Sequence, residues 1–332
     1  MKTISIVTPC FNEEENIEEC YNIIKEIFDN KLTMYRREHI FCDNASTDRT
    51  VDILRKIAEI DPEIKIILNQ RNVGPMRSNY NGVMAAGGDA VVLFMPADLQ
   101  DPPELIPEMI DKWEQGAEIV YGIRATRSEG FILRSVRKLY YRLISRFSTI
   151  NVPPDVGDYQ LVDRRIVEGM RHIEDSYPFM RIMTFEVGGR SVGIPYHWRA
   201  RKRGISKNNI LTLLDQGLNG LVTFTVAPIR LTLYFGFLIA FCSVLYAALN
   251  LIYGLLFFGH IAQPGIMTLI VALFFFGGVQ LFFLGLIGEY ILAIYGQVRK
   301  KPMVIERDRI NFIPSTLTPT TERPISRCSE NP

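Results

Sequence analysis

The sequence has no excess of either charge and little cysteine. Its 332 residues carry 37 lysine and arginine side chains against 36 aspartate and glutamate side chains, a formal net charge of +1. This balance argues against nucleic acid or another extended polyanion as the partner, so any charge effect must be local. The five cysteines show neither CxxC nor histidine-linked spacing. That pattern argues against a zinc or disulfide framework and is typical of buried thiols in a reducing compartment.

Charge is also absent from two long stretches, residues 231–258 and 265–288. Each exceeds the roughly 20 residues that cross about 30 Å of hydrocarbon. Both are apolar all round, whereas a helix buried in a soluble core usually keeps a polar face. We therefore expect a hairpin of two transmembrane helices, at about 231–258 and 265–290, with a buried core hairpin as the alternative.

Basic residues flank this pair of segments on both sides. They are Arg199, Arg201, Lys202, Arg203, Lys207 and Arg230 before it, and Arg299, Lys300 and Lys301 after it. By the positive-inside rule, both ends of the hairpin lie in the cytoplasm. The N-terminal run MKTISIVTPC lacks a small-residue cleavage site, so it is predicted to be a first strand and no signal peptide.

Strands and helices are predicted to alternate through the first 122 residues. Short apolar segments at 4–9, 40–43, 64–68, 90–95 and 118–121 predict strands, and helical spacing lies between them at 50–59, 77–86 and 103–115. Asn12 followed by Glu15 predicts a capping box for the first helix. Such alternation indicates an α/β fold with a mainly parallel sheet, whose ligands bind beyond the carboxyl ends of the strands.

Polar clusters follow several of these strands, in the segments FNEEEN, DNAST and ADLQD, and we expect them to converge in one crevice. Asp98 and Gln100 come after a buried strand, and a carboxylate with an amide two residues later suits a hard divalent cation. The alternative for Asp98 is a helix-capping role. Asp101, with Pro102 and Pro103, is predicted to start the next helix.

The remaining segments predict the domain boundaries. A basic, aromatic-rich stretch at 124–147 is either a solvated amphipathic helix or a face near anionic headgroups or phosphates. We expect a catalytic domain at 1–206, a juxtamembrane amphipathic segment at 207–229, the membrane helices within 230–298 and a tail at 299–332. The tail is rich in proline, serine and threonine and is predicted to be disordered after about residue 314.

Five motifs occur together: TPCFNEEENI, CDNASTD, NVGPMRSNYNG, ADLQDPPE and RKRGISK. With this set the chain resembles the family 2 glycosyltransferases of the GT-A fold, which is Rossmann-like. It is most similar to the polyisoprenyl-phosphate glycosyltransferases, which include dolichol-phosphate mannosyltransferase and the bactoprenol glucosyltransferases. The resemblance covers roughly residues 3–310, including the two C-terminal spans typical of the bactoprenol branch.

The resemblance implies a role for each matching residue. It places the donor nucleotide at Pro9, Phe11, Glu13, Asp43, Asn44, Arg124 and Lys207, the metal and diphosphate at Asp98 and Gln100, and catalysis at Asp158 and Arg201. The metal would be Mg²⁺ or Mn²⁺. Arg201 and Lys207 also suit a positive-inside anchor, and Asp158 also suits a turn or helix cap.

The implied reaction is transfer of a hexose, with UDP-glucose favoured, to a polyisoprenyl phosphate such as undecaprenyl phosphate, with inversion. The product would be a lipid-linked sugar for cell-surface glycan modification. The enzyme would lie in a bacterial inner membrane with both termini and the catalytic domain in the cytoplasm, and it would be a possible homo-oligomer. Because a phosphate monoester with a second pKa of about 6 is mostly dianionic at neutral pH, Asp158 is expected to orient the acceptor more than to act as a strong base.

Two other functions compete with this interpretation. A processive polysaccharide synthase would carry a Q-x-x-R-W motif, which the sequence lacks. A non-catalytic membrane scaffold stays open as an alternative because of two departures: Pro96 stands where relatives often have the first acid of an Asp-x-Asp motif, and Asn44 where they often have the second acid of an Asp-Asp pair. The substrate diphosphate can supply the missing charge, so an active enzyme is the preferred hypothesis.

Overall fold

The computed structural model describes residues 1–124, 152–153, 156–173, 175, 178–199, 234–239, 241, 245, 265–298 and 302–312. The chain forms two compact units, Met1–Leu99 with Val304–Pro332, and Gln100–Met303. Several predictions lie outside the described residues: Arg201, Lys207, most of the basic stretch, the juxtamembrane segment and the tail after residue 314. The predicted domain boundaries stay predictions.

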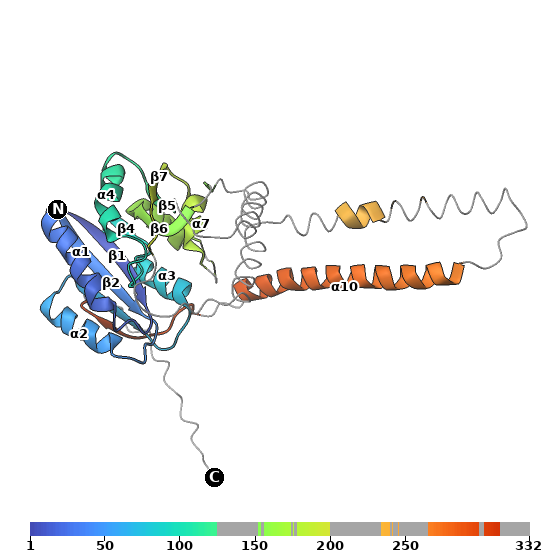
Figure 1. Ribbon diagram of the computed structural model, residues 1–332, viewed down its shortest axis with the longest axis horizontal. Helices are drawn as coiled ribbons and strands as arrows, with labels where there is room; N and C mark the ends of the chain where they lie inside the picture. The colour runs from blue at the N-terminus through green and yellow to red at the C-terminus, as the bar shows by residue number, and fades with distance from the viewer. Residues whose placement is uncertain are drawn as a thin grey trace, which may run out of the picture. The chain divides into compact units, whose positions relative to one another are not determined.

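The first unit contains the sheet expected from the N-terminal alternation. Its strands are β1 (Lys2–Cys10), β2 (Tyr35–Asp43), β3 (Ile64–Asn69), β4 (Ala90–Val92) and β8 (Glu306–Ile310), in the order β4-β1-β2-β3-β8 (Figure 1). The first four are parallel, and β8 is antiparallel to β3. The mainly parallel sheet is thus confirmed, whereas β8, which comes after both apolar stretches, was not predicted.

Helices α1 (Ile17–Lys31), α2 (Thr50–Ile60) and α3 (Pro75–Ala85) connect these strands. The apolar faces of α1 and α2 pack on one side of the sheet, in a core of Ile17, Tyr21, Leu54, Ile57, Phe41, Ile64, Ile66 and Leu68. The other side receives α3, where Gly82 lies against the sheet so closely that an added Cβ would come within 2.2 Å of Cys42 Sγ. Cys10, Cys20 and Cys42 are buried free thiols, as predicted.

The second unit contains three strands, β5 (Ile119–Arg124), β6 (Val156–Asp163) and β7 (Ser191–Tyr196), in the order β7-β5-β6. β5 pairs antiparallel with β6 and parallel with β7. Its helical elements are η1 (Pro103–Leu105), α4 (Ile106–Glu114), α6 (Arg164–Arg171), α7 (Met180–Val187) and α10 (Gly265–Val298). Of these strands, only β5 was predicted from the sequence.

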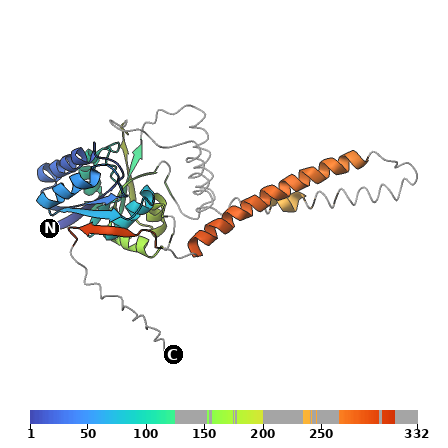
Figure 2. The same ribbon diagram turned by 90° about the horizontal axis from the view of Figure 1, so that it is seen from below.

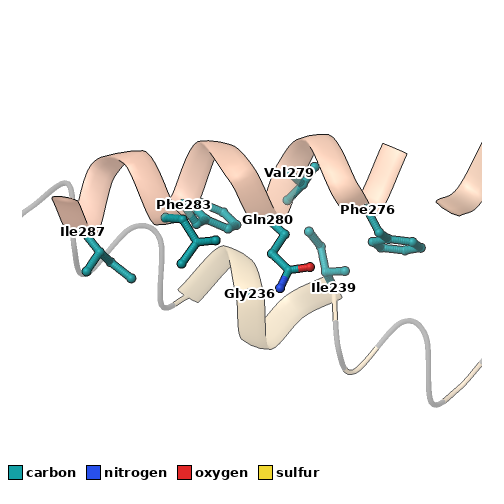
Figure 3. Close-up of a pocket in the computed structure, with 8 residues that line it drawn as sticks. Gly236, Ile239, Phe276, Val279, Gln280, Phe283 and Ile287 are labelled. Atoms are coloured by element: carbon teal, nitrogen blue, oxygen red, sulfur yellow. The ribbon is translucent and has the colours of Figure 1, made fainter. Parts of the chain in front are cut away.

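The second apolar stretch is helical through α10 (Figures 1 and 2). Beside it lies the short described helical turn at 234–239, and a pocket between them is lined by Gly236, Ile239, Phe276, Val279, Gln280, Phe283, Leu284 and Ile287 (Figure 3). Gln280 is the one polar side chain in that lining. Among the described residues, no helix qualifies as long and apolar enough to cross a membrane. The membrane hairpin therefore stays a prediction.

Candidate active site

In the first unit, two loops meet at the carboxyl edge of the sheet. Cys10 and Asp43 end β1 and β2 and are register partners in this parallel pair. The Asn44 N–H continues the ladder by donating to Cys10 O at 2.9 Å. Because parallel strands end at the same edge, the loops that follow are neighbours.

Asn12 ties these two loops together. Its N–H donates to Ser46 Oγ at 2.9 Å, and its Oδ1 accepts from the Thr47 N–H at 2.8 Å. Its φ of 56° lies in the left-handed region, which asparagine tolerates better than most residues. The predicted capping box was therefore wrong: α1 begins at Ile17, and Asn12 serves the loop instead.

Pro9, Phe11, Glu13, Asp43 and Asn44 lie at or just beyond the ends of β1 and β2, and their role in nucleotide binding stays a prediction. Phe11 and Glu13 are half-buried. The Glu13 N–H donates to Thr50 Oγ1 at 2.9 Å, and its carboxylate accepts from Asn16 Nδ2 at 2.7 Å. The loop is thus held by hydrogen bonds to its backbone as well as to its side chains.

Asp43 is fully buried, and its carboxylate accepts the Ser46 N–H at 3.1 Å. Burial raises the pKa of Asp43 above its usual value, while the N–H groups of Ala45 and Ser46 and the charge of Arg307 oppose that rise. Arg307 belongs to β8. The next residue, Asp308, is the register partner of Leu68 on β3, and Leu68 is in turn the register partner of Asp43 on β2. The C-terminal strand therefore adds a cation close to the predicted nucleotide site.

Asn44 connects the end of β2 to the loop before α3. Its Oδ1 accepts from the Val73 N–H at 2.9 Å, and its Nδ2 donates to Asn72 Oδ1 at 2.8 Å. Asn72 Oδ1 also accepts the Gly74 N–H at 2.9 Å, where Gly74 has a φ of 88°. An aspartate could accept from Val73 but could not donate to Asn72. The amide at this position is therefore specified by the loop that it holds.

Asp98 lies just beyond β4, in a turn closed by the Leu99 N–H donating to Pro96 O at 3.1 Å. Leu99 has a φ of 57°, and Asp98 is half-buried. Within the described part of the chain, no group of three or more His, Cys, Asp or Glu residues is placed to hold a metal. Asp98 belongs to the first unit and Gln100 to the second, and their role as metal ligands stays a prediction.

In the second unit, Asp101 organises Arg124. Asp101 is only 1% exposed and accepts a hydrogen bond from the Tyr196 hydroxyl. Arg124 Nη2 lies 3.4 Å from both Asp101 oxygens, and Arg124 Nε donates to Tyr196 Oη at 3.1 Å. The helix start predicted at Asp101, Pro102 and Pro103 is confirmed for the two prolines, since Pro102 caps η1 and Pro103 begins it, whereas Asp101 precedes the cap and turns inward to a cation.

The charge of Arg124 is fixed by these neighbours. Burial alone would lower its pKa, but Asp101 and Tyr196 raise it overall. Burial and the Asp101 carboxylate both raise the pKa of Tyr196, which keeps its hydroxyl protonated as a donor. The guanidinium also lies 5.3 Å from the centre of the Trp198 ring. Arg124 is therefore a preorganised cation.

Asp158, the predicted catalytic residue, lies on β6 with a side chain that is 19% exposed. Both of its oxygens are engaged by Arg181 of α7, with Nε to Oδ1 at 3.0 Å and a closer contact from Nη2 to Oδ2. Sequence reasoning missed Arg181, as it missed Tyr196. Neither partner lies near its acid in the sequence or forms a motif with it.

Comparison with known proteins shows to which family the chain belongs. The model for "Glycosyl transferase family 2" matches residues 5–171. The chain belongs to this family. It is 37% identical over 302 residues to the glycosyltransferase YkcC of Bacillus subtilis, with 91% of this chain and 92% of that protein covered.

Other relatives carry more specific names. The SfII prophage-derived bactoprenol glucosyl transferase of Shigella flexneri is 36% identical over 303 residues, which cover 91% of this chain and 96% of that protein. A solved structure of glucosyl-3-phosphoglycerate synthase from Mycobacterium tuberculosis, with Mn²⁺, UDP-glucose and phosphoglyceric acid, has a TM-score of 0.47 and 18% identity. It covers 67% of this chain and 78% of its own. Family membership confirms the predicted glycosyltransferase and the GT-A-like α/β fold.

Proposed function

We propose that this glycosyltransferase transfers glucose from UDP-glucose to the phosphate of a membrane polyisoprenyl phosphate. The observation that carries the proposal is the extent of the match to proteins named bactoprenol glucosyl transferase. It spans 303 residues, whereas the family model ends at residue 171. The similarity therefore continues through most of the C-terminal half, which contains both uncharged stretches.

The proposed step is an in-line displacement at the anomeric carbon. An acceptor phosphate oxygen forms the new bond to that carbon while the bond to the UDP oxygen breaks, and UDP leaves with the electron pair. The transition state resembles an oxocarbenium ion, as in other glycosyl transfers, and the configuration inverts. Asp158 orients the acceptor, whose phosphate is already mostly dianionic at neutral pH.

The leaving diphosphate gathers negative charge, and the chain supplies cations for it. Arg124 is held in place by Asp101 and Tyr196 before any substrate binds, so it stabilises the transition state without reorganising. Arg201 and Lys207 are proposed for the same charge. Asp98 and Gln100 would hold Mg²⁺ or Mn²⁺ together with the diphosphate, and the ion would neutralise part of its charge.

We also propose that residues 231–258 and 265–290 form a membrane hairpin in a bacterial inner membrane, with the catalytic domain and both termini in the cytoplasm. Large apolar side chains along α10 support this, because Leu269, Leu273 and Leu281 are 68%, 68% and 70% exposed. A row of exposed leucines marks a surface that another apolar phase covers. In this arrangement, a soluble sugar nucleotide can meet a lipid phosphate at the level of the headgroups.

The test is transfer of radiolabelled glucose from UDP-glucose to undecaprenyl phosphate, with the full chain in membranes and with Mg²⁺ or Mn²⁺. Label should enter the organic phase, and EDTA should lower the rate by at least about tenfold because the diphosphate charge loses its counter-ion. GDP-mannose serves as the control donor. UDP binding without transfer from any common sugar nucleotide would favour the scaffold and contradict the proposal.

A further inference from the structure

The carboxylate of Asp158 forms a bidentate ion pair with Arg181. Arg181 Nε donates to one oxygen at 3.0 Å, and Nη2 contacts the other. The two side chains are 19% and 18% exposed, so solvent screens them little. A bidentate pair fixes the plane of the carboxylate as well as its distance, which a lysine cannot do.

Arg181 is itself fixed by its surroundings in the second unit. Its guanidinium lies 5.3 Å from the centre of the Phe179 ring. Its backbone oxygen accepts from Gln160 Nε2 at 3.2 Å, and Gln160 Oε1 accepts in turn from Thr184 Oγ1 at 2.9 Å. Gln160 and Thr184 are fully buried. β6 therefore holds both the acid and, through Gln160, the start of the helix that bears its partner.

This arrangement solves an electrostatic problem of the proposed reaction. Both substrates are phosphate anions, and an isolated carboxylate beside them would repel the acceptor that it has to orient. Pairing with Arg181 makes the acid part of a neutral unit, which lowers this repulsion. A fixed plane also limits the orientations that a bound acceptor can adopt.

We infer that Arg181 is a positioning residue of the transferase, which acts through Asp158 by aiming its carboxylate and cancelling its charge. The inference rests on the proposed function of Asp158. It predicts that Arg181 matters only while the acid is present.

A double-mutant cycle tests this on the full chain in nanodiscs, with single-turnover transfer to undecaprenyl phosphate. Arg181→Ala should lower the rate about 10 to 100-fold and raise the acceptor KM, since the acid is both misplaced and unpaired. In an Asp158→Asn background the same change should cost about twofold or less, because coupled residues are not additive. Arg181→Lys should recover only part of the loss, because lysine restores the positive charge but cannot bond both carboxylate oxygens in one plane.

Arg171→Ala is the matched control, since Arg171 pairs with Glu168 on the surface of the same unit, and it should leave the rate unchanged. Thermal melts of each variant exclude misfolding. Equal losses from Arg181→Ala in both backgrounds, or no loss in the wild-type background, would overturn the inference. A wild-type chain that transfers no sugar would instead contradict the proposed function, and this is seen before any variant is measured.

Discussion

The two units hold their candidate site residues by different kinds of bond. In the first unit, short neutral side chains bond to backbone groups, as Asn12 does with Thr47 and Asn44 with Val73. In the second, charged side chains bond to one another, as Arg124 does with Asp101 and Arg181 with Asp158. Loop shape is therefore set by the backbone in one unit, and the positions of charges are set by ion pairs in the other.

The difference fits the two tasks proposed for them. A nucleotide base and ribose are recognised by a loop of fixed shape, whose hydrogen-bonding groups must be correctly placed. Charge that develops during a reaction is stabilised by ions and dipoles that are already aimed at it. Substitutions in the second unit should therefore affect turnover most, and those at the loops of the first unit should affect nucleotide affinity.

The largest effect is expected from Asp101→Asn. The change keeps the size of the side chain but removes the charge that holds Arg124, so kcat should fall about 10² to 10³-fold. Stability should fall by at most about 3 kcal/mol, because Arg124 is partly exposed and solvent screens its lost pair. Steady-state kinetics and thermal melts measure the two quantities.

Glu104→Gln is the control for this substitution. Glu104 is three residues along the chain and pairs with Arg199 on the surface, where 48% and 51% of the side chains are exposed. Its loss should change stability by less than about 0.5 kcal/mol. If Asp101→Asn kept wild-type turnover, ion pairs in the second unit would serve the fold alone and the comparison would fail.

The difference between the two units also explains which of their site residues could be predicted from the sequence. Asp43 and Asn44 end a buried strand, and parallel topology alone sends such residues to one edge, so the candidate nucleotide site followed from local pattern. Tyr196 and Arg181 are found only once the chain is folded, because they lie 95 and 23 residues from their acids. The two prolines after Asp101 correctly predicted a helix start, but the contacts of Asp101 with Arg124 and Tyr196 depend on the fold and have no local signal.

A smaller effect, on affinity, is expected from Asn44→Asp, which introduces the second acid of an Asp-Asp pair. The aspartate would lose the hydrogen bond to Asn72 and place a second carboxylate beside the buried Asp43. We expect the dissociation constant of UDP to rise about tenfold, as for the loss of one hydrogen bond with added repulsion. Calorimetry measures it, and Asn22→Asp on the exposed face of α1 is the control. UDP bound as tightly as by the wild type would show that the loop does not need the amide.

The smallest change in function is expected from Glu38→Gln, because the ion pair of Glu38 lies in the first unit but away from the carboxyl edge. Glu38 pairs with Lys65 at 2.5 Å and accepts the Gly87 N–H at 2.8 Å. Burial alone would raise the pKa of Glu38, but Lys65, Ser5 and Gly87 lower it overall from about 4.5. A carboxylate with a lowered pKa contributes stability above its unfolded pKa, and this is lost as the pH falls through the folded value.

At neutral pH, Glu38→Gln should therefore cost about 1–3 kcal/mol, with UDP affinity and turnover unchanged. The difference in unfolding free energy from the wild type should shrink as the pH falls below about 4.5, because the glutamate then takes up a proton in the unfolded chain more readily than in the folded protein. Denaturant unfolding at pH 7 and pH 3.5 measures it, with Glu63→Gln, whose partner Arg36 is 64% exposed, as the control. A difference independent of pH would mean that the charge of Glu38 contributes nothing. A loss of turnover would mean that ion pairs of the first unit also serve catalysis.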